Sequence, residues 1–209
     1  MLLASLLMGG VLKGQELITI GRSKQLIGDL NGLQAALHVY RHRYGTLPGD
    51  DGNAATRWAS AGAKAGDNDG LIGGKYQNQV APGSDPSTQA NLAESISFWW
   101  HLRLAGFVLG PAVGNGAADL PTNSSGGIVG VQQAEAGFIP TLMACASNVS
   151  ARSAIAVDSE FDDRLPAAGR VRARRQTGGI SSPALADADV VQNYVEDGTS
   201  RYVVCRALD

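Results

Sequence analysis

The sequence GGVLKGQELITIGRSKQLIGDLNGLQAALHVYRHRYGTLPGDD, residues 9–51, decides the fold because it reads as one long helix that ends in a turn. In its second half the apolar residues recur alternately four and three positions apart, which is typical of one face of an α-helix. This stripe consists of Leu26, Leu30, Leu33, Leu37, Tyr40 and Tyr44. No proline precedes Pro48, and Gly45 suits a helix C-terminus. We therefore expect a single helix from the start of the chain to about Tyr44.

The predicted helix has two halves that need different surroundings. Residues 1–12, MLLASLLMGGVL, carry no charge and must be buried in lipid or among other helices. By themselves they are too short to cross a bilayer, which needs roughly 20 residues. The later stripe suits packing on a globular head. We expect residues 1–25 to form the membrane or filament-core half of the helix, and residues 26–209 to form one head that includes the rest of it.

Several glycines lie within this predicted helix. Gly10 and Gly14 form a GxxxG pattern, and Gly14, Gly21 and Gly28 recur every seven residues, which places them near one face where another helix can approach closely. Each glycine inside a helix costs about 1 kcal/mol relative to alanine. Two interpretations stay open at this point: tolerated imperfections, or a helix that packs against copies of itself.

The composition of the chain limits its partners and predicts long loops. The chain has 209 residues, a formal net charge of −2 and a pI of about 5.9, so no global charge attracts nucleic acid or anionic membranes, and any such contact must be local. Its 27 Gly and 8 Pro predict long loops. Cys145 and Cys205 belong to no CxxC motif; they are either free thiols of a cytoplasmic protein or one disulfide of an exported domain.

The N-terminal region resembles that of type IV pilin-like and type II secretion pseudopilin-like proteins. Residues 9–51 carry the clearest similarity, and weaker similarity continues through the head, at residues 53–58, 66–74, 97–106 and 161–173. The resemblance implies an α+β lollipop, in which a long N-terminal α-helix packs on a small antiparallel β-sheet head with long loops. Family members begin with a basic leader ending in Gly, cut before a residue that is often Phe, with Glu four residues later. We expect that leader and about nine mature residues to precede Met1.

The resemblance also implies a function. It predicts a structural subunit, pilin or pseudopilin, of a type IV pilus or a type II secretion filament, polymerising through its N-terminal helix. Its head would be periplasmic, with the inner membrane, copies of itself or other pilins, the filament assembly machinery and, where a leader exists, a prepilin peptidase as partners. The alternative is a non-polymerising membrane-anchored envelope protein with a ligand- or DNA-binding head. A C-terminal disulfide is common in pilins, which favours a Cys145–Cys205 bond; closing a loop of about 60 residues would contribute about 4 kcal/mol.

Three further elements are expected in the head. Residues 95–106, SISFWWHLRLAG, predict a short helix, and because adjacent Trp99 and Trp100 cannot both face one core, one of them should be partly exposed. Residues 127–131 are a strand candidate, and residues 201–208 alternate as strands do. A disulfide would require this last strand to pair with the segment around Cys145.

Residues 67–70, Asp-Asn-Asp-Gly, offer oxygen ligands of the kind that calcium prefers. Asp67 and Asp69 are the candidates, and Asp50 and Asp51 can add carboxylates. This is not an EF-hand, because Asn78 stands where that motif needs a glutamate. Turn formation explains the same residues, so the sequence predicts either no cofactor or one calcium ion.

No motif points to catalysis. The basic run of residues 170–175 would place Arg170, Arg172 and Arg174 on one face of a strand, but no aromatic residue interleaves them, so we expect a solvated face and no nucleic-acid partner. His38 and His42, four residues apart, lack a third metal ligand and belong to a solvated helix face. The chain is not expected to be an enzyme.

Overall fold

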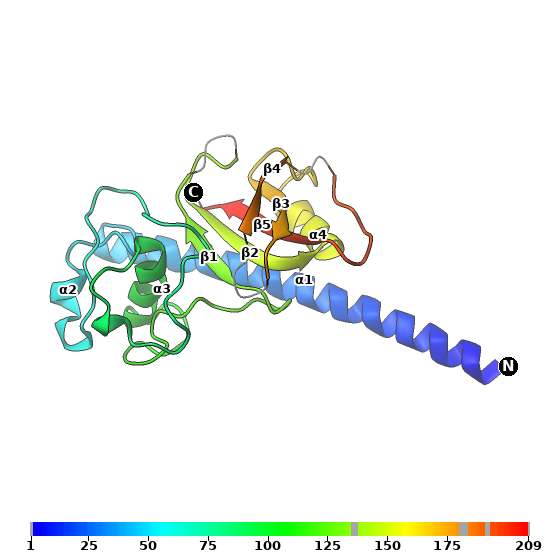
Figure 1. Cartoon of the computed structure of the whole chain (residues 1–209), viewed down its shortest axis with the longest axis horizontal. Coiled ribbons are helices and arrows are strands. Elements are labelled where there is room, and N and C mark those ends of the chain that lie inside the picture. The colour runs from blue at the N-terminus through cyan, green and yellow to red at the C-terminus, as the bar shows by residue number, and fades with distance from the viewer. Residues whose placement is uncertain (1, 135–137, 180–183, 191–192, 209) are drawn as a thin grey trace.

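The computed structural model describes residues 2–134, 138–179, 184–190 and 193–208, with side chains from residue 13 onward except those of residues 184–190. One long helix supports a sheet, and the shorter helices lie toward the two ends of the head (Figure 1). The helices are α1 (Leu2–Tyr44), α2 (Ala54–Arg57), α3 (Glu94–Leu104) and α4 (Ala151–Phe161). The strands are β1 (Val129–Gln132), β2 (Met143–Ser150), β3 (Val171–Thr177), β4 (Ala184–Val190) and β5 (Arg201–Ala207). The predicted α+β lollipop is confirmed.

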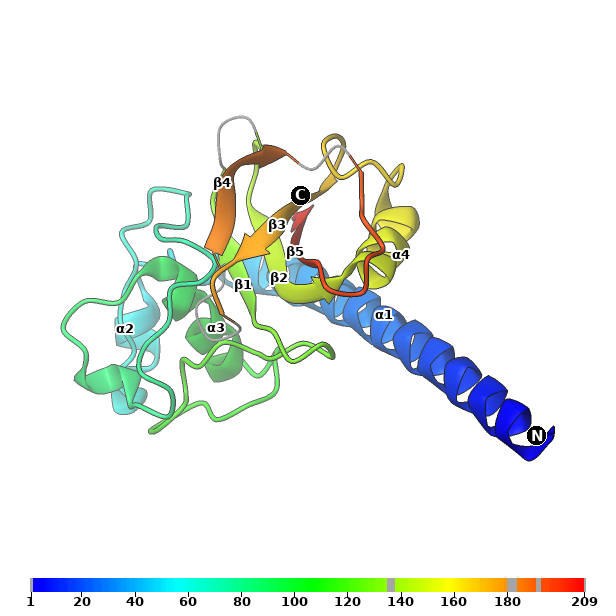
Figure 2. The ribbon, with the colours of Figure 1, turned by 45° about the vertical axis from the view of Figure 1, so that its right-hand side comes forward.

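The sheet is antiparallel, with strand order β1-β2-β5-β3-β4. Helix α1 runs along one face of it and then projects beyond the head toward the N-terminus, as both ribbon views show (Figures 1 and 2). The predicted stripe lies at this contact. Tyr44, its last residue, is half-buried, and the other five side chains are at most 4% exposed: Leu26, Leu30, Leu33, Leu37 and Tyr40. Helix and sheet therefore share one hydrophobic core.

A disulfide joins the neighbouring strands β2 and β5. Cys145 on β2 and Cys205 on β5 are direct neighbours in the register, and their sulfur atoms are 2.07 Å apart. Both residues are fully buried. The predicted bond is confirmed, and it links segments 60 residues apart in the chain.

The C-terminal end of α1 is fixed by a buried polar contact. Gly45 adopts φ of 75°, a left-handed conformation that ends the helix as the sequence predicts. One turn earlier, the hydroxyl of Tyr40 donates to a carboxylate oxygen of Asp51 at 2.7 Å, and Arg57 donates to the same oxygen. Asp51 is fully buried, so these donors replace the water that its charge would otherwise require.

A buried histidine ties together the loops beyond this end. His101, on α3, accepts a hydrogen bond at Nδ1 from the Gly49 amide, at 2.9 Å, and its Nε2 lies 2.9 Å from the Lys64 carbonyl oxygen. A neutral ring with its proton on Nε2 satisfies both contacts. Burial lowers the pKa of His101 to about 4, so the ring is neutral at physiological pH.

The expectation of a partly exposed tryptophan is wrong. Trp99 and Trp100 are both at most 3% exposed, because they point into different clusters. Trp99 packs with Phe98 in the main core, whereas Trp100 packs in a second, smaller cluster with Ile96. Ala117 and Ala118 of the loop after α3 belong to that second cluster, and Trp100 Nε1 donates to the Ala112 carbonyl of the same loop at 2.9 Å.

The basic run on β3 also differs from expectation. Arg174 is buried, with its guanidinium 4.4 Å from the centre of the Phe138 ring, a cation–π contact. Arg170 is exposed and Arg172 half-buried. The prediction of a solvated basic face is therefore wrong for Arg174, because tertiary packing takes this arginine into the core.

Candidate functional site

The outward face of α1 is lined by small and apolar residues. At roughly 100° per residue, Gly21 and Gly28 lie about opposite the stripe that packs on the head. The face continues in both directions with other short or apolar side chains, and we call it the glycine ridge: Gly14, Leu17, Gly21, Gly28, Gly32, Ala35 and Val39. All are exposed except Gly14, which is half-exposed. Gly10, the fourth glycine of the sequence prediction, lies outside the residues whose side chains the structure describes.

The ridge glycines pack against no other part of the described chain. A Cβ atom added at Gly14, Gly21, Gly28 or Gly32 would meet nothing within 4 Å outside the local helix backbone. The head therefore does not require glycine at these positions, although each one weakens the helix by about 1 kcal/mol relative to alanine. Space for another backbone to approach is a physical reason for glycine here.

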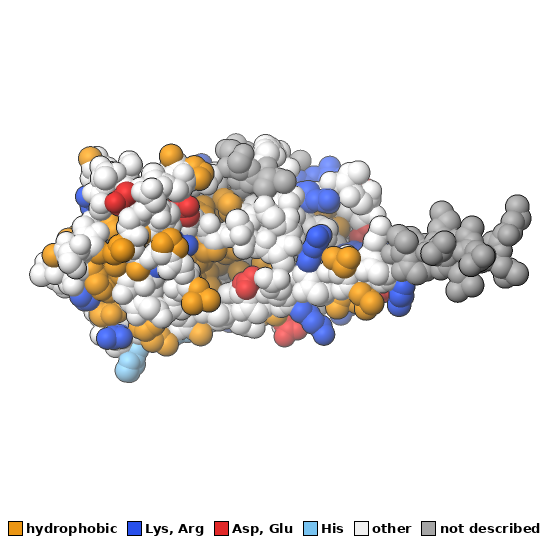
Figure 3. Space-filling model, turned by 90° about the horizontal axis from the view of Figure 1, so that it is seen from below, with side chains coloured by type: hydrophobic (Ala, Val, Ile, Leu, Met, Phe, Trp, Pro, Cys, Tyr) orange, Lys and Arg blue, Asp and Glu red, His pale blue; other side chains and the backbone are white. Residues whose placement is uncertain are grey.

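Large apolar side chains are exposed where α1 leaves the head. Leu17, Ile18 and Ile20 are 62%, 57% and 45% exposed. They surround the helix and do not form one stripe, and Figure 3, viewed from below, shows hydrophobic side chains at this part of it. Among the described helices, none combines the length with the apolar character required to cross a lipid bilayer.

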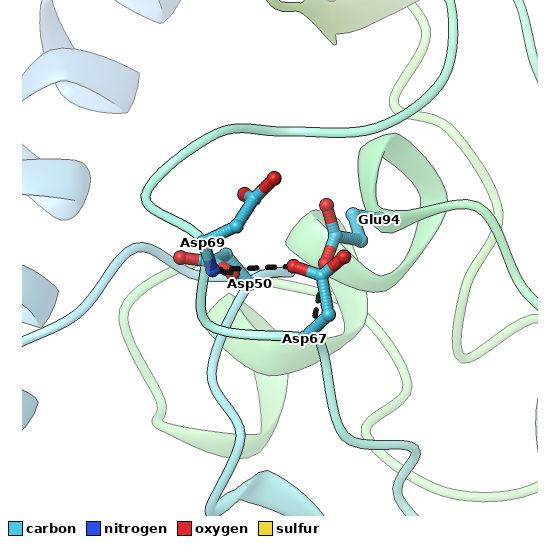
Figure 4. A group of neighbouring side chains, drawn as sticks. All are labelled: Asp50, Asp67, Asp69 and Glu94. Carbon is cyan, nitrogen blue, oxygen red and sulfur yellow. Dashed lines mark hydrogen bonds between the residues drawn. The ribbon is translucent and has the colours of Figure 1, made fainter.

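A cluster of carboxylates lies near the C-terminal end of α1. Asp50, Asp67, Asp69 and Glu94 each place one oxygen within 4.8 Å of the others (Figure 4). Asp67 and Asp69 come from the predicted turn, and Asp50 from the loop after α1. Glu94 begins α3 and was not among the predicted residues. The helix start predicted for residues 95–106 placed it near a helix N-terminus, but only the fold brings it to the turn.

The same carboxylates hold the turn through backbone amides. Asp50 is buried, and its two oxygens accept from the amides of Asp69 and Gly70, each at 3.0 Å. Glu94 accepts from the amides of Asp67 at 3.1 Å and Gly73 at 2.7 Å. Burial, together with the nearby charge of Glu94, raises the pKa of Asp50, although its amide donors oppose the shift. The cluster is thus a loop anchor with negative charge in excess.

Asp51 and the two histidines of α1 lie outside this cluster. Asp51 turns toward Tyr40 and Arg57 and takes no part in it. The hydrogen bonds from Tyr40 and Arg57 outweigh the effect of burial, which acts to raise the pKa of Asp51, and hold that pKa below its usual value. His38 and His42 are exposed on α1, where a solvated face was predicted.

Comparison with known proteins adds no assignment: no family model, no curated protein and no solved structure matches the chain.

Proposed function

We propose that this protein is a structural filament subunit, a pilin or pseudopilin of a type IV pilus or a type II secretion system. In this proposal α1 packs against the same helix of neighbouring subunits, and the head stays outside the helical core. The subunit is held in the inner membrane before assembly, with its head in the periplasm, and it has no catalytic role.

One observation carries the proposal: α1 has small or apolar residues on two opposite faces, and the described part of the head covers only one of them. The stripe from Leu26 to Tyr40 is buried on the sheet. The glycine ridge on the other side has the composition of a helix–helix interface, with small residues that allow close approach, and no described part of the head covers it. A helix that only carried the head would need no second face of this kind.

The exposed apolar residues support the same conclusion. Leu17, Ile18 and Ile20 would each gain on the order of 1 kcal/mol from transfer out of water, given that full burial of such a side chain is worth about 1.5–3 kcal/mol. Lipid provides this burial before assembly, and neighbouring helices provide it afterwards.

We further propose that calcium binds the carboxylate cluster. Calcium prefers six to eight oxygen ligands, and a carboxylate oxygen that accepts one amide hydrogen bond keeps a lone pair for a metal. Asp50, Asp67, Asp69 and Glu94 offer only oxygen donors and an excess of negative charge, which fits calcium. The ion would supply charge neutralisation and tie the turn to α3 and to the end of α1.

Substitution of a ridge glycine tests the filament assignment. Gly28→Leu should leave the head folded, because a side chain there meets open space, and should raise its melting temperature slightly. The same variant should stop assembly, because the added side chain keeps neighbouring helices apart. His38→Leu is the matched control: it lies on the same helix, is exposed and is off the ridge, so it should assemble.

The measurement is the amount of filament sheared from cells, or assembled after overproduction, at equal subunit levels. Normal filaments from the Gly28→Leu variant would contradict packing through the ridge. If no filament forms even from the wild-type chain in a cell with active assembly machinery, the envelope-anchor alternative takes its place.

A further inference from the structure

A polar groove lies beside α1 at the end of the head from which this helix projects (Figure 1), a surface we call the underside. The buried hydrogen bond between the hydroxyls of Ser23 on α1 and Ser153 on α4, at 3.1 Å, joins the two helices. On the N-terminal side of this contact, α1 separates from the head and leaves a groove of about 680 Å³. Its lining comes from α1, from the start of α4 and from the segment that leads into β5, and includes Glu16, Arg22, Arg152, Glu196 and Arg201.

The groove has a surplus of positive charge. Its two acids are already paired, Glu16 with Lys13 and Glu196 with Arg152, both at 2.8 Å. Within the described residues, no carboxylate lies at ion-pair distance from Arg22 or Arg201, and both are exposed. The guanidinium of Arg201 donates hydrogen bonds to the backbone carbonyl oxygens of residues 198 and 200. This local basic surface contrasts with the net charge of −2 for the whole chain.

The position of the groove matters as much as its charge. Helix α4 and the segment before β5 lie at the end of the head from which α1 projects (Figures 1 and 2). Leu17 and Ile20, large exposed apolar residues, immediately precede Arg22 on α1. At 1.5 Å per residue, Arg22 lies only about 8 Å beyond Leu17 along the helix axis.

We propose that this underside binds the headgroups of anionic phospholipids while the subunit is anchored in the membrane. The inference rests on the proposed function, because it requires α1 to be inserted. The polar region of a bilayer is about 5–8 Å thick on each side, so Arg22 reaches the phosphates when Leu17 and Ile20 contact the hydrocarbon boundary. Lys13, on the N-terminal side of that boundary, is neutralised by its pairing with Glu16 and has a long stem with which to reach the interface.

The chemistry of the groove fits a phosphodiester with a small polar headgroup. Arginine guanidinium groups bind phosphate oxygens through two parallel hydrogen bonds. The hydroxyl group of Ser125 also lines the groove and can bind a glycerol headgroup. Each basic residue held near an anionic surface favours the bound state about fivefold, and the effect falls off within a Debye length.

The test uses the full-length protein reconstituted in phosphatidylcholine bilayers, with spin-labelled phosphatidylglycerol or spin-labelled phosphatidylcholine as probe. The relative association of the two labelled lipids with the protein is measured by electron spin resonance at low and at high salt. We expect a preference for phosphatidylglycerol that weakens with salt. Arg22→Gln should reduce this preference by up to about fivefold, and Arg201→Gln should act similarly.

Arg41→Gln is the matched control, since Arg41 is an exposed arginine on the same helix, roughly 28 Å farther from the membrane at 1.5 Å per residue. It should leave the preference unchanged. No preference in the wild-type protein, or an equal loss in the Arg22 and Arg41 variants, would overturn the inference. Failure to reconstitute into phosphatidylcholine at all would instead contradict the membrane anchor and hence the proposed function.

Discussion

The substitution Tyr40→Phe removes one oxygen atom and tests whether the hydrogen bond from Tyr40 to Asp51 holds α1 to the head. In Tyr40→Phe the ring stays in place, but Asp51 loses the donor that lies 2.7 Å from its carboxylate. Both residues are fully buried, so no water replaces the hydroxyl. A hydrogen bond to a charged group is worth about 1.5–3 kcal/mol, and we expect unfolding to become easier by about 2 kcal/mol. For a domain of this size that corresponds to a melting temperature lower by roughly 4–8 °C.

The assay is thermal and urea unfolding in detergent micelles, followed by circular dichroism. Tyr44→Phe is the control, one helical turn farther along: the Tyr44 ring packs 4.6 Å from that of Tyr40, but its hydroxyl makes no hydrogen bond within the described residues. We expect the control to change stability by less than about 0.5 kcal/mol. Equal effects of the two substitutions would refute the assignment of Asp51 as a buried charge that depends on Tyr40.

Two further predictions follow from the loop network. The pKa of His101 is about 4 in the folded chain, below the usual 6.5, so the neutral ring contributes stability above pH 6.5 that is lost as pH falls toward 4. In a pH series of unfolding curves, His101→Gln should remove this loss of the free energy of unfolding between pH 6.5 and 4. An unchanged dependence of that free energy on pH would contradict the prediction. Calcium at about 100 times its Kd should stabilise the head by about 2.7 kcal/mol, and the double variant Asp67→Asn with Asp69→Asn should abolish the shift. Equal melting temperatures with calcium and with a chelator would rule out calcium binding.

His101 and Asp50 hold the same loop, the one that follows α1. His101 connects the loop after α1 to residue 64, while Asp50 connects the same loop to the turn at residues 69 and 70. Protonation of the histidine would remove its ability to accept from Gly49. The end of the head at the C-terminal end of α1 therefore depends on groups that must stay neutral or paired, and a fall in pH should loosen it before the disulfide-linked sheet.

The sequence predicted the features that depend on local periodicity. The spacing of Leu26, Leu30, Leu33 and Leu37 identified both the helix and its buried face, because side chains three and four residues apart share a face in any α-helix. Gly45 marked the helix end for a similarly local reason. The Cys145–Cys205 pair was predicted through family resemblance, since spacing alone left free thiols open.

Other features depended on residues distant in sequence, and only the tertiary structure decided them. Trp100 is buried because a loop folds beneath α3, and Arg174 is buried because Phe138 lies over it. Glu94 joins Asp67 only when α3 packs beside the turn. The groove at Arg22 needs the starts of α4 and β5 to lie beside α1. The sequence by itself determined a long helix with one face for a head, because helical periodicity is encoded within a few turns. Which charges meet one another was decided by the tertiary structure, because contacts across long loops depend on how the whole chain packs.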